Sequence, residues 1–125
     1  MSRQHLLRIF ALLCVFAVLA LGGAPAFAHA IIVEAVPAND AEVHGTSVQV
    51  KLRYNNRIDH ARSRLVLLDG YGKERVVEIA PDSPTDQLIA TIDNVAPGQY
   101  RLRWQVLALD GHITRGDIPF TVVAP

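Results

Sequence analysis

The chain has 125 residues, with 12 basic and 12 acidic side chains, five histidines, and one cysteine, one methionine and one tryptophan. Its balanced charge provides no basic surface for nucleic acid or for an anionic membrane, so we expect neither as a partner. This length suits a single folded domain.

The first 28 residues have the pattern of a secretory signal peptide. Two arginines open the segment, residues 9–21 are almost continuously apolar, and Ala26-Phe27-Ala28 has the small-x-small form that precedes cleavage. The apolar run is short for a membrane-spanning helix, which needs roughly 20 residues. We therefore expect cleavage after Ala28, export to the periplasm, and a mature domain of residues 29–125 that does not span a membrane.

Cleavage would remove Met1 and Cys14, so the mature domain of 97 residues would contain no thiol and no thioether. It would also leave ten basic side chains against 12 acidic ones, a formal charge of −2. Small exported domains often depend on disulfides. This one must be stabilised by its core, alone or together with a bound ion.

Short segments of alternating apolar and polar residues follow His29, separated by turn residues and without helical periodicity. The predicted strands are 30–36, 48–54, 65–68, 75–79, 88–92, 100–106 and 118–123. About seven strands without a helix predict an all-β fold, an antiparallel Greek-key β-sandwich or small barrel. Residues 55–62 and 42–45 are predicted to be loops, and Pro119 predicts an edge or a bulge in the last strand. The expected core contains Val50, Leu52, Ile92, Tyr100, Leu102, Trp104 and Phe120.

His29 is the first candidate for chemistry, because cleavage would make it the first residue. It would then carry two nitrogen donors, its α-amine and its imidazole, which can chelate one metal ion. An internal histidine offers only the ring, since its backbone nitrogen is an amide. The alternative is that His29 is only the residue that the peptidase leaves in front.

Asp110-Gly111-His112 supplies a second imidazole beside a carboxylate. Two residues apart in an extended segment can point to the same side, so His112 could bind a metal while Asp110 supports it from an axial position or through the ring. The alternative is an ordinary turn. His44 is predicted to be a solvent-exposed loop residue, and His60 is a weaker candidate ligand.

The donor set also favours particular metals. Amine and imidazole nitrogens with a carboxylate suit Cu(II), and Zn(II) comes second. Cu(I) prefers sulfur ligands, which the mature domain lacks.

Taken in order, the motifs resemble those of the CopC family of periplasmic copper-binding proteins, over essentially all of the mature chain. The matching pieces are His29-Ala30 after Ala-x-Ala, Pro37-Ala38-Asn39-Asp40, the stretch from Pro97 to Trp104, Asp110-Gly111-His112 and Gly116. The resemblance implies a β-sandwich of immunoglobulin-like or cupredoxin-like character with Cu(II) held by His29 and His112, and with Asp110 in support.

Two departures from the family narrow this expectation. A methionine-rich loop for Cu(I) is missing, so we expect one Cu(II) per chain. Asn56 stands where some members have a glutamate near the copper, which leaves open whether Asn56, Asp59 or His60 contributes.

These observations favour a monomeric periplasmic Cu(II) carrier or buffer in copper homeostasis or resistance, one that passes copper to an inner-membrane transporter and is not an enzyme. Two alternatives stay open: a copper-dependent oxidative enzyme with the same histidine chelate, and a metal-free sandwich module that binds another protein.

Overall fold

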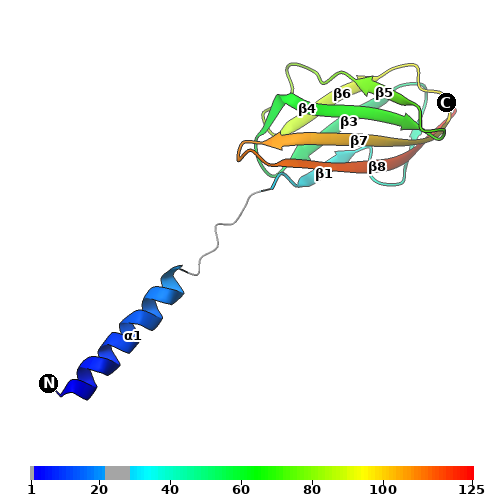
Figure 1. Cartoon of the computed structure of the whole chain (residues 1–125). Helices are drawn as coiled ribbons and strands as arrows, with labels where there is room; N and C mark the ends of the chain where they lie inside the picture. The colour runs from blue at the N-terminus through cyan, green and yellow to red at the C-terminus, as the bar shows by residue number, and fades with distance from the viewer. Residues whose placement is uncertain (1, 22–28) are drawn as a thin grey trace.

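The computed structural model describes residues 2–21 and 29–125 (Figure 1). Its elements are α1 (Arg3–Leu21), β1 (Ile32–Val36), β2 (Ala41–His44), β3 (Val48–Tyr54), β4 (Ile58–Asp69), β5 (Glu74–Val77), β6 (Gln87–Ile92), β7 (Gly98–Ala108) and β8 (Ile113–Val123). Across the described residues, we find no helix with the length and apolar character needed to cross a bilayer. The expected cleavage point after Ala28 lies outside the described residues.

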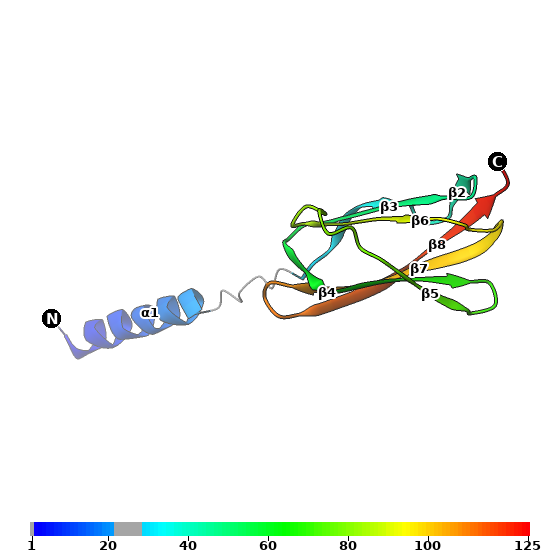
Figure 2. The same cartoon turned by 90° about the horizontal axis from the view of Figure 1, so that it is seen from above.

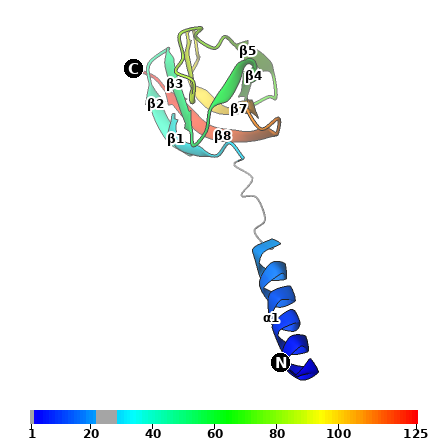
Figure 3. The same ribbon diagram turned by 90° about the vertical axis from the view of Figure 1, so that its left-hand side faces the viewer.

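The strands form two sheets packed face to face, one with the order β1-β3-β6 and the other with the order β2-β8-β7-β4-β5. Figure 2 shows the two layers from above, and Figure 3 shows them from one end. The paired strands are antiparallel except β2 and β8, which run parallel. This arrangement confirms the expected all-β sandwich.

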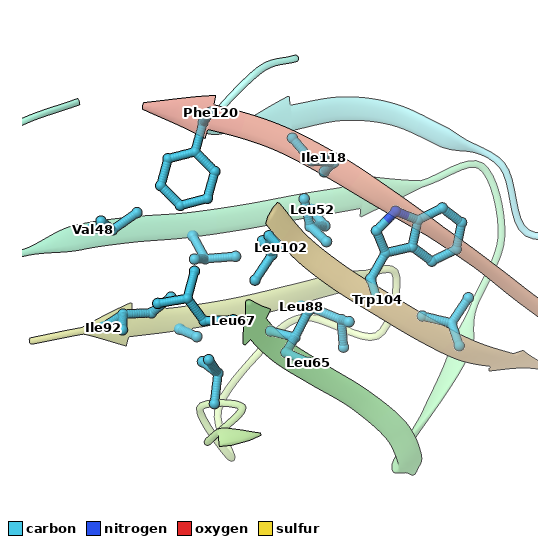
Figure 4. Close-up of a cluster of buried hydrophobic side chains, with 14 of the residues drawn as sticks. Val48, Leu52, Leu65, Leu67, Leu88, Ile92, Leu102, Trp104, Ile118 and Phe120 are labelled. Atoms are coloured by element: carbon cyan, nitrogen blue, oxygen red, sulfur yellow. The ribbon is translucent and has the colours of Figure 1, made fainter. Parts of the chain in front are cut away.

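The core lies between the sheets, where the inward side chains of each alternating strand meet (Figure 4). Of the seven predicted core residues, the buried ones are Val50, Leu52, Ile92, Leu102, Trp104 and Phe120. Tyr100 is only partly buried. Its ring stacks on Phe120 at a centroid distance of 5.8 Å, and its hydroxyl donates a 2.7 Å hydrogen bond to the carbonyl of Ala96. A polar group on the ring explains why Tyr100 lies at the border of the core.

Trp104 anchors the half of the core nearest the start of β8. Its indole lies edge-on to the ring of Tyr54, with centroids 5.6 Å apart, and it covers Gly116, its register partner on β8. A Cβ at Gly116 would come within 2.8 Å of the indole. The missing side chain on β8 is therefore what lets the indole lie against that strand.

Three details of the sequence interpretation were wrong. Ala41–His44 forms the short strand β2 instead of a turn, because it pairs with the outer edge of β8. The predicted loop 55–62 ends at Ile58, whose buried side chain starts β4 beside Ala108; a bulge between Asp59 and Arg64 follows.

The third detail concerns Pro119, which was expected at an edge or a bulge. It lies in β8, between β7 and β2. Its carbonyl accepts a hydrogen bond from the backbone of Asp40, just before β2 begins. The nitrogen and carbonyl of a strand residue face the same neighbour, so the missing N–H faces the very start of β2 and leaves the ladder with β7 intact.

Candidate metal centre

The turn between β7 and β8 positions two of the candidate ligands. It is closed by hydrogen bonds from the backbone N–H of Ala108 to the carbonyl of His112 (2.9 Å) and from Gly111 to the carbonyl of Ala108 (3.0 Å). Gly111 has φ +86°, a conformation that side chains with a Cβ rarely adopt. Glycine at this position therefore allows the tight turn that places Asp110 and His112 side by side.

Asp110 holds His112 at two points. One carboxylate oxygen, Oδ1, accepts the backbone N–H of His112 at 3.0 Å, and the other, Oδ2, lies 3.2 Å from Nδ1 of the ring. These contacts, the backbone hydrogen bond foremost, hold the pKa of the Asp110 carboxyl below its ordinary value. The carboxylate is thus ionised at neutral pH and fixes the orientation of the imidazole.

The arm before β1 positions His29. Ala30 is fully buried in the core. The backbone of Ile31 forms two hydrogen bonds with Asn55, one with its side chain and one with its backbone. The N–H of Ile31 donates to Oδ1 of Asn55 at 2.8 Å, and the N–H of Asn55 donates to the carbonyl of Ile31 at 3.0 Å. A buried methyl and a two-point clamp therefore fix the arm directly behind His29.

These two segments bring the three predicted ligands together at one end of the sandwich, the end opposite the C-terminus (Figure 1). One potential ligand atom from each of His29, Asp110 and His112 lies within 4.8 Å of the others. The two imidazoles meet edge to face, with centroids 5.2 Å apart and an interplanar angle of 81°. All three residues are exposed to solvent, so an ion could reach them without any rearrangement of the core.

The other candidates do not join this cluster. His44 pairs with Val123 at the far end of β8. His60 Nε2 lies 2.7 Å from the carbonyl oxygen of Gln87 on β6, and is therefore engaged with the opposite sheet.

The polar residues beside His60 are engaged locally as well. The carboxylate of Asp59 accepts the backbone N–H of Arg62 at 3.3 Å and lies 3.9 Å from the Nε of the same arginine. The side chain of Asn56 accepts the backbone N–H of Arg57 at 2.8 Å. Within the described part of the chain, the cluster of three or more histidine and carboxylate groups is made by His29, Asp110 and His112 alone.

Sequence reasoning missed Asn55, which it treated only as the start of a loop. Its role depends on a contact with Ile31, 24 positions earlier in the chain, and no local sequence pattern predicts such a contact.

Comparisons with known proteins identify the family of this chain. The CopC domain family model matches residues 32–123. The chain belongs to the CopC family. Asp110 and His112 fall inside the matched span, whereas His29 precedes it.

Individual relatives include proteins named for copper resistance and copper transport. The chain is 30% identical over 110 residues to the copper resistance protein C of Xanthomonas campestris pv. juglandis, covering 82% of this chain and 86% of the relative. It is 28% identical over 100 residues to the copper transport protein CutJ of Bacillus subtilis (strain 168), covering 77% of this chain. That match spans only 18% of CutJ, a much longer protein.

A solved structure supports the fold. The crystal structure of CopC from Methylosinus trichosporium OB3b superimposes with a TM-score of 0.66 at 32% identity, covering 77% of this chain and 95% of that one. The chain is therefore a CopC-family member, similar to proteins named for copper resistance and copper transport.

Proposed function

We propose that the chain is exported, cleaved after Ala28, and then serves as a monomeric periplasmic Cu(II) carrier or buffer with one copper site. The observation that carries this proposal is the convergence of His29, Asp110 and His112 at one solvent-exposed end of a CopC-family sandwich. The nitrogen-rich donor set suits Cu(II), and residues 29–125 contain no sulfur ligand for Cu(I).

The proposed roles follow from chemistry. In the uncleaved chain the backbone nitrogen of His29 is a peptide amide, which is a poor donor. After cleavage it is an amine, and the amine and the ring of His29 chelate the ion together. His112 adds a third nitrogen.

Asp110 acts through the ring of His112. Because its carboxylate contacts Nδ1, Nε2 is the nitrogen that we assign to copper. The carboxylate orients the ring and makes it a stronger donor.

Exposure of these three residues also suits a carrier, because an acceptor protein can place its own ligands beside the ion before it leaves. We propose an inner-membrane copper transporter as that acceptor. Such exchange requires no substrate pocket at the metal and no catalytic step, so we propose no enzymatic activity.

The experiment compares two proteins exported from full-length chains, one with the natural sequence and one with Gly-Ser-Gly-Ser inserted between Ala28 and His29. The insertion has four residues because Gly-Ser alone would create Gly-Ser-His, which is itself a copper-chelating chain start. Native mass spectrometry first establishes the cleavage point and the copper stoichiometry, expected to be one. The insertion keeps both imidazoles but converts the chelating amine into an amide.

Cu(II) affinity should therefore fall by orders of magnitude, and the nitrogen hyperfine pattern in the copper EPR spectrum should change. Equal affinity and an identical spectrum for the two proteins would show that the amine is not a ligand. If the natural protein binds no copper, the carrier function itself is wrong.

A further inference from the structure

A groove with a volume of about 580 Å³ lies on the five-stranded sheet, over β4, β7 and β8. Arg64, Gln105 and Arg115 line it and are register partners across these three strands, so they form one row on the same face. Neighbouring strands lie ~4.8 Å apart, which places the backbones of Arg64 and Arg115 roughly 10 Å apart. The row therefore presents two guanidinium groups separated by an amide.

The two arginines of this row differ from the arginines further along β7. Arg103 donates two hydrogen bonds to the carboxylate of Asp117, at 2.9 and 3.2 Å, and Arg101 lies 3.7 Å from the same carboxylate. Arg64 and Arg115 are exposed, and neither has a carboxylate within ion-pair distance in the part of the chain that the structure describes. Glu74 and Asp117 also line the groove, but their carboxylates contact Arg103. Arg64 and Arg115 therefore have no ion-pair partner of their own, in a domain whose formal charge is −2.

This charged row continues into the surface around the metal centre. Two positions nearer the turn between β7 and β8, the next register pair on this face is Leu107 and Ile113. Leu107 precedes this metal-centre turn (residues 109–112), and Ile113 follows it. Ile113 is 55% exposed, and Leu109 within the turn is 64% exposed. Large apolar side chains thus lie between the arginine row and the candidate ligands.

We propose that this continuous surface, from Arg64 and Arg115 to Ile113 and Leu109, docks an acidic segment of the protein that accepts copper. The inference rests on the proposed carrier function, because it identifies where the acceptor binds while it takes the ion. Guanidinium groups bind carboxylates through paired hydrogen bonds. The spacing of the two arginine backbones suits two carboxylates on one chain segment better than a single small anion.

The physical consequence is a faster encounter. Opposite charges steer two proteins together and orient them, and salt screens this attraction. The exposed apolar side chains are buried once the surfaces meet, which holds the acceptor next to the ligands. The arginine row should therefore change the rate of copper transfer and leave the equilibrium affinity for copper unchanged.

Two synthetic acceptor peptides test this. Both begin with the copper-chelating sequence Gly-Gly-His, followed by a flexible linker and either six glutamates or six glutamines. Exported protein beginning at His29 is loaded with one equivalent of Cu(II), and transfer is followed by stopped-flow absorbance at low and high salt. We expect the glutamate peptide to take copper about tenfold faster than the glutamine peptide at low salt, and equally fast at high salt.

Charge reversals locate the effect. Arg64→Glu and Arg115→Glu should each reduce the preference for the glutamate peptide, with no change in Cu(II) affinity. Lys73→Glu is the matched control, because Lys73 is exposed and precedes β5 at the end of the sheet remote from the metal-centre turn. It should keep the preference.

Equal rates for the two peptides would overturn the proposal, and so would an effect of Lys73→Glu as large as that of Arg115→Glu. Capture of the loaded protein by phosphatidylglycerol vesicles, lost in Arg115→Glu, would assign the surface to a membrane and also overturn it. A natural protein that binds no Cu(II) would remove the carrier function, and this docking surface with it.

Discussion

Replacement of Gly116 by alanine tests the packing that supports the metal-centre hairpin. The new Cβ would lie 2.8 Å from Cζ2, 2.9 Å from Cε2 and 3.1 Å from Nε1 of Trp104. Carbon atoms in favourable contact are about 3.5–4.0 Å apart, so the indole would have to move by about 1 Å. Trp104 is only 8% exposed and lies against Tyr54, which restricts that movement.

We therefore expect Gly116→Ala to lower the free energy of unfolding by about 1–3 kcal/mol, the usual cost of overpacking a core. For a domain of this size each kcal/mol lowers Tm by about 4–8 °C. Urea unfolding of the metal-free exported protein, followed by the fluorescence of its one tryptophan, measures the change directly.

Gly70→Ala is the matched control, since a Cβ at Gly70 would lie 3.7 Å from the carbonyl oxygen of Gln99, an ordinary contact. It adds the same methyl group and removes the same freedom from the unfolded chain, so the difference between the two variants isolates the indole contact. A free energy for Gly116→Ala within about 0.5 kcal/mol of that for Gly70→Ala would refute the packing argument.

Three further predictions concern the site and the sheet. His112→Ala should weaken Cu(II) binding by more than about 100-fold, beyond what loss of a merely supporting residue causes. His44→Ala should leave the Cu(II) affinity measured by competition titration unchanged. Equal losses of affinity in the two variants would show that His112 is not the ligand. Asn55→Ala should weaken binding by roughly fivefold, the value of one hydrogen bond, with recovery in Asn55→Asp, which keeps an acceptor oxygen; an unchanged affinity would mean that the arm is positioned without this clamp. Hydrogen bonds from Arg103 hold the pKa of the Asp117 carboxyl below its ordinary value. The ionised carboxylate therefore stabilises the fold fully above the unfolded pKa of about 3.9, and this stabilisation is lost as pH falls through the folded pKa. Tm should decline less on acidification in Asp117→Asn than in the natural protein, and parallel declines of Tm would contradict this.

Strand alternation was enough to predict the sandwich, because a strand with one buried face repeats every two residues. The segments around Leu52 and Trp104 show that repeat clearly, and both side chains are buried. The same reasoning failed for Ala41–His44, because its pairing with β8 joins residues about 80 positions apart (Ala41 with Phe120). Four residues carry too little periodicity to reveal a partner that distant.

The candidate ligands were predictable for a different reason. A histidine at an expected chain start and an Asp-Gly-His turn are visible locally, and their chemistry does not depend on the fold. Their proximity was not visible locally. It depends on the burial of Ala30 and on the Asn55 clamp, both formed between segments remote in sequence.

The proposed centre links copper binding to export. Before cleavage the nitrogen of His29 is an amide, so the cluster offers two imidazoles and a carboxylate but no chelating amine. The proposed cleavage would add the amine at a residue that the fold already holds beside His112, with ring centroids 5.2 Å apart. Ala30 anchors the arm in the core, and Gly111 shapes the turn, so the packing that stabilises the sandwich also sets the spacing of the donors. Under the proposed function, tight copper binding would begin only where the leader is removed, because the last donor would be created there.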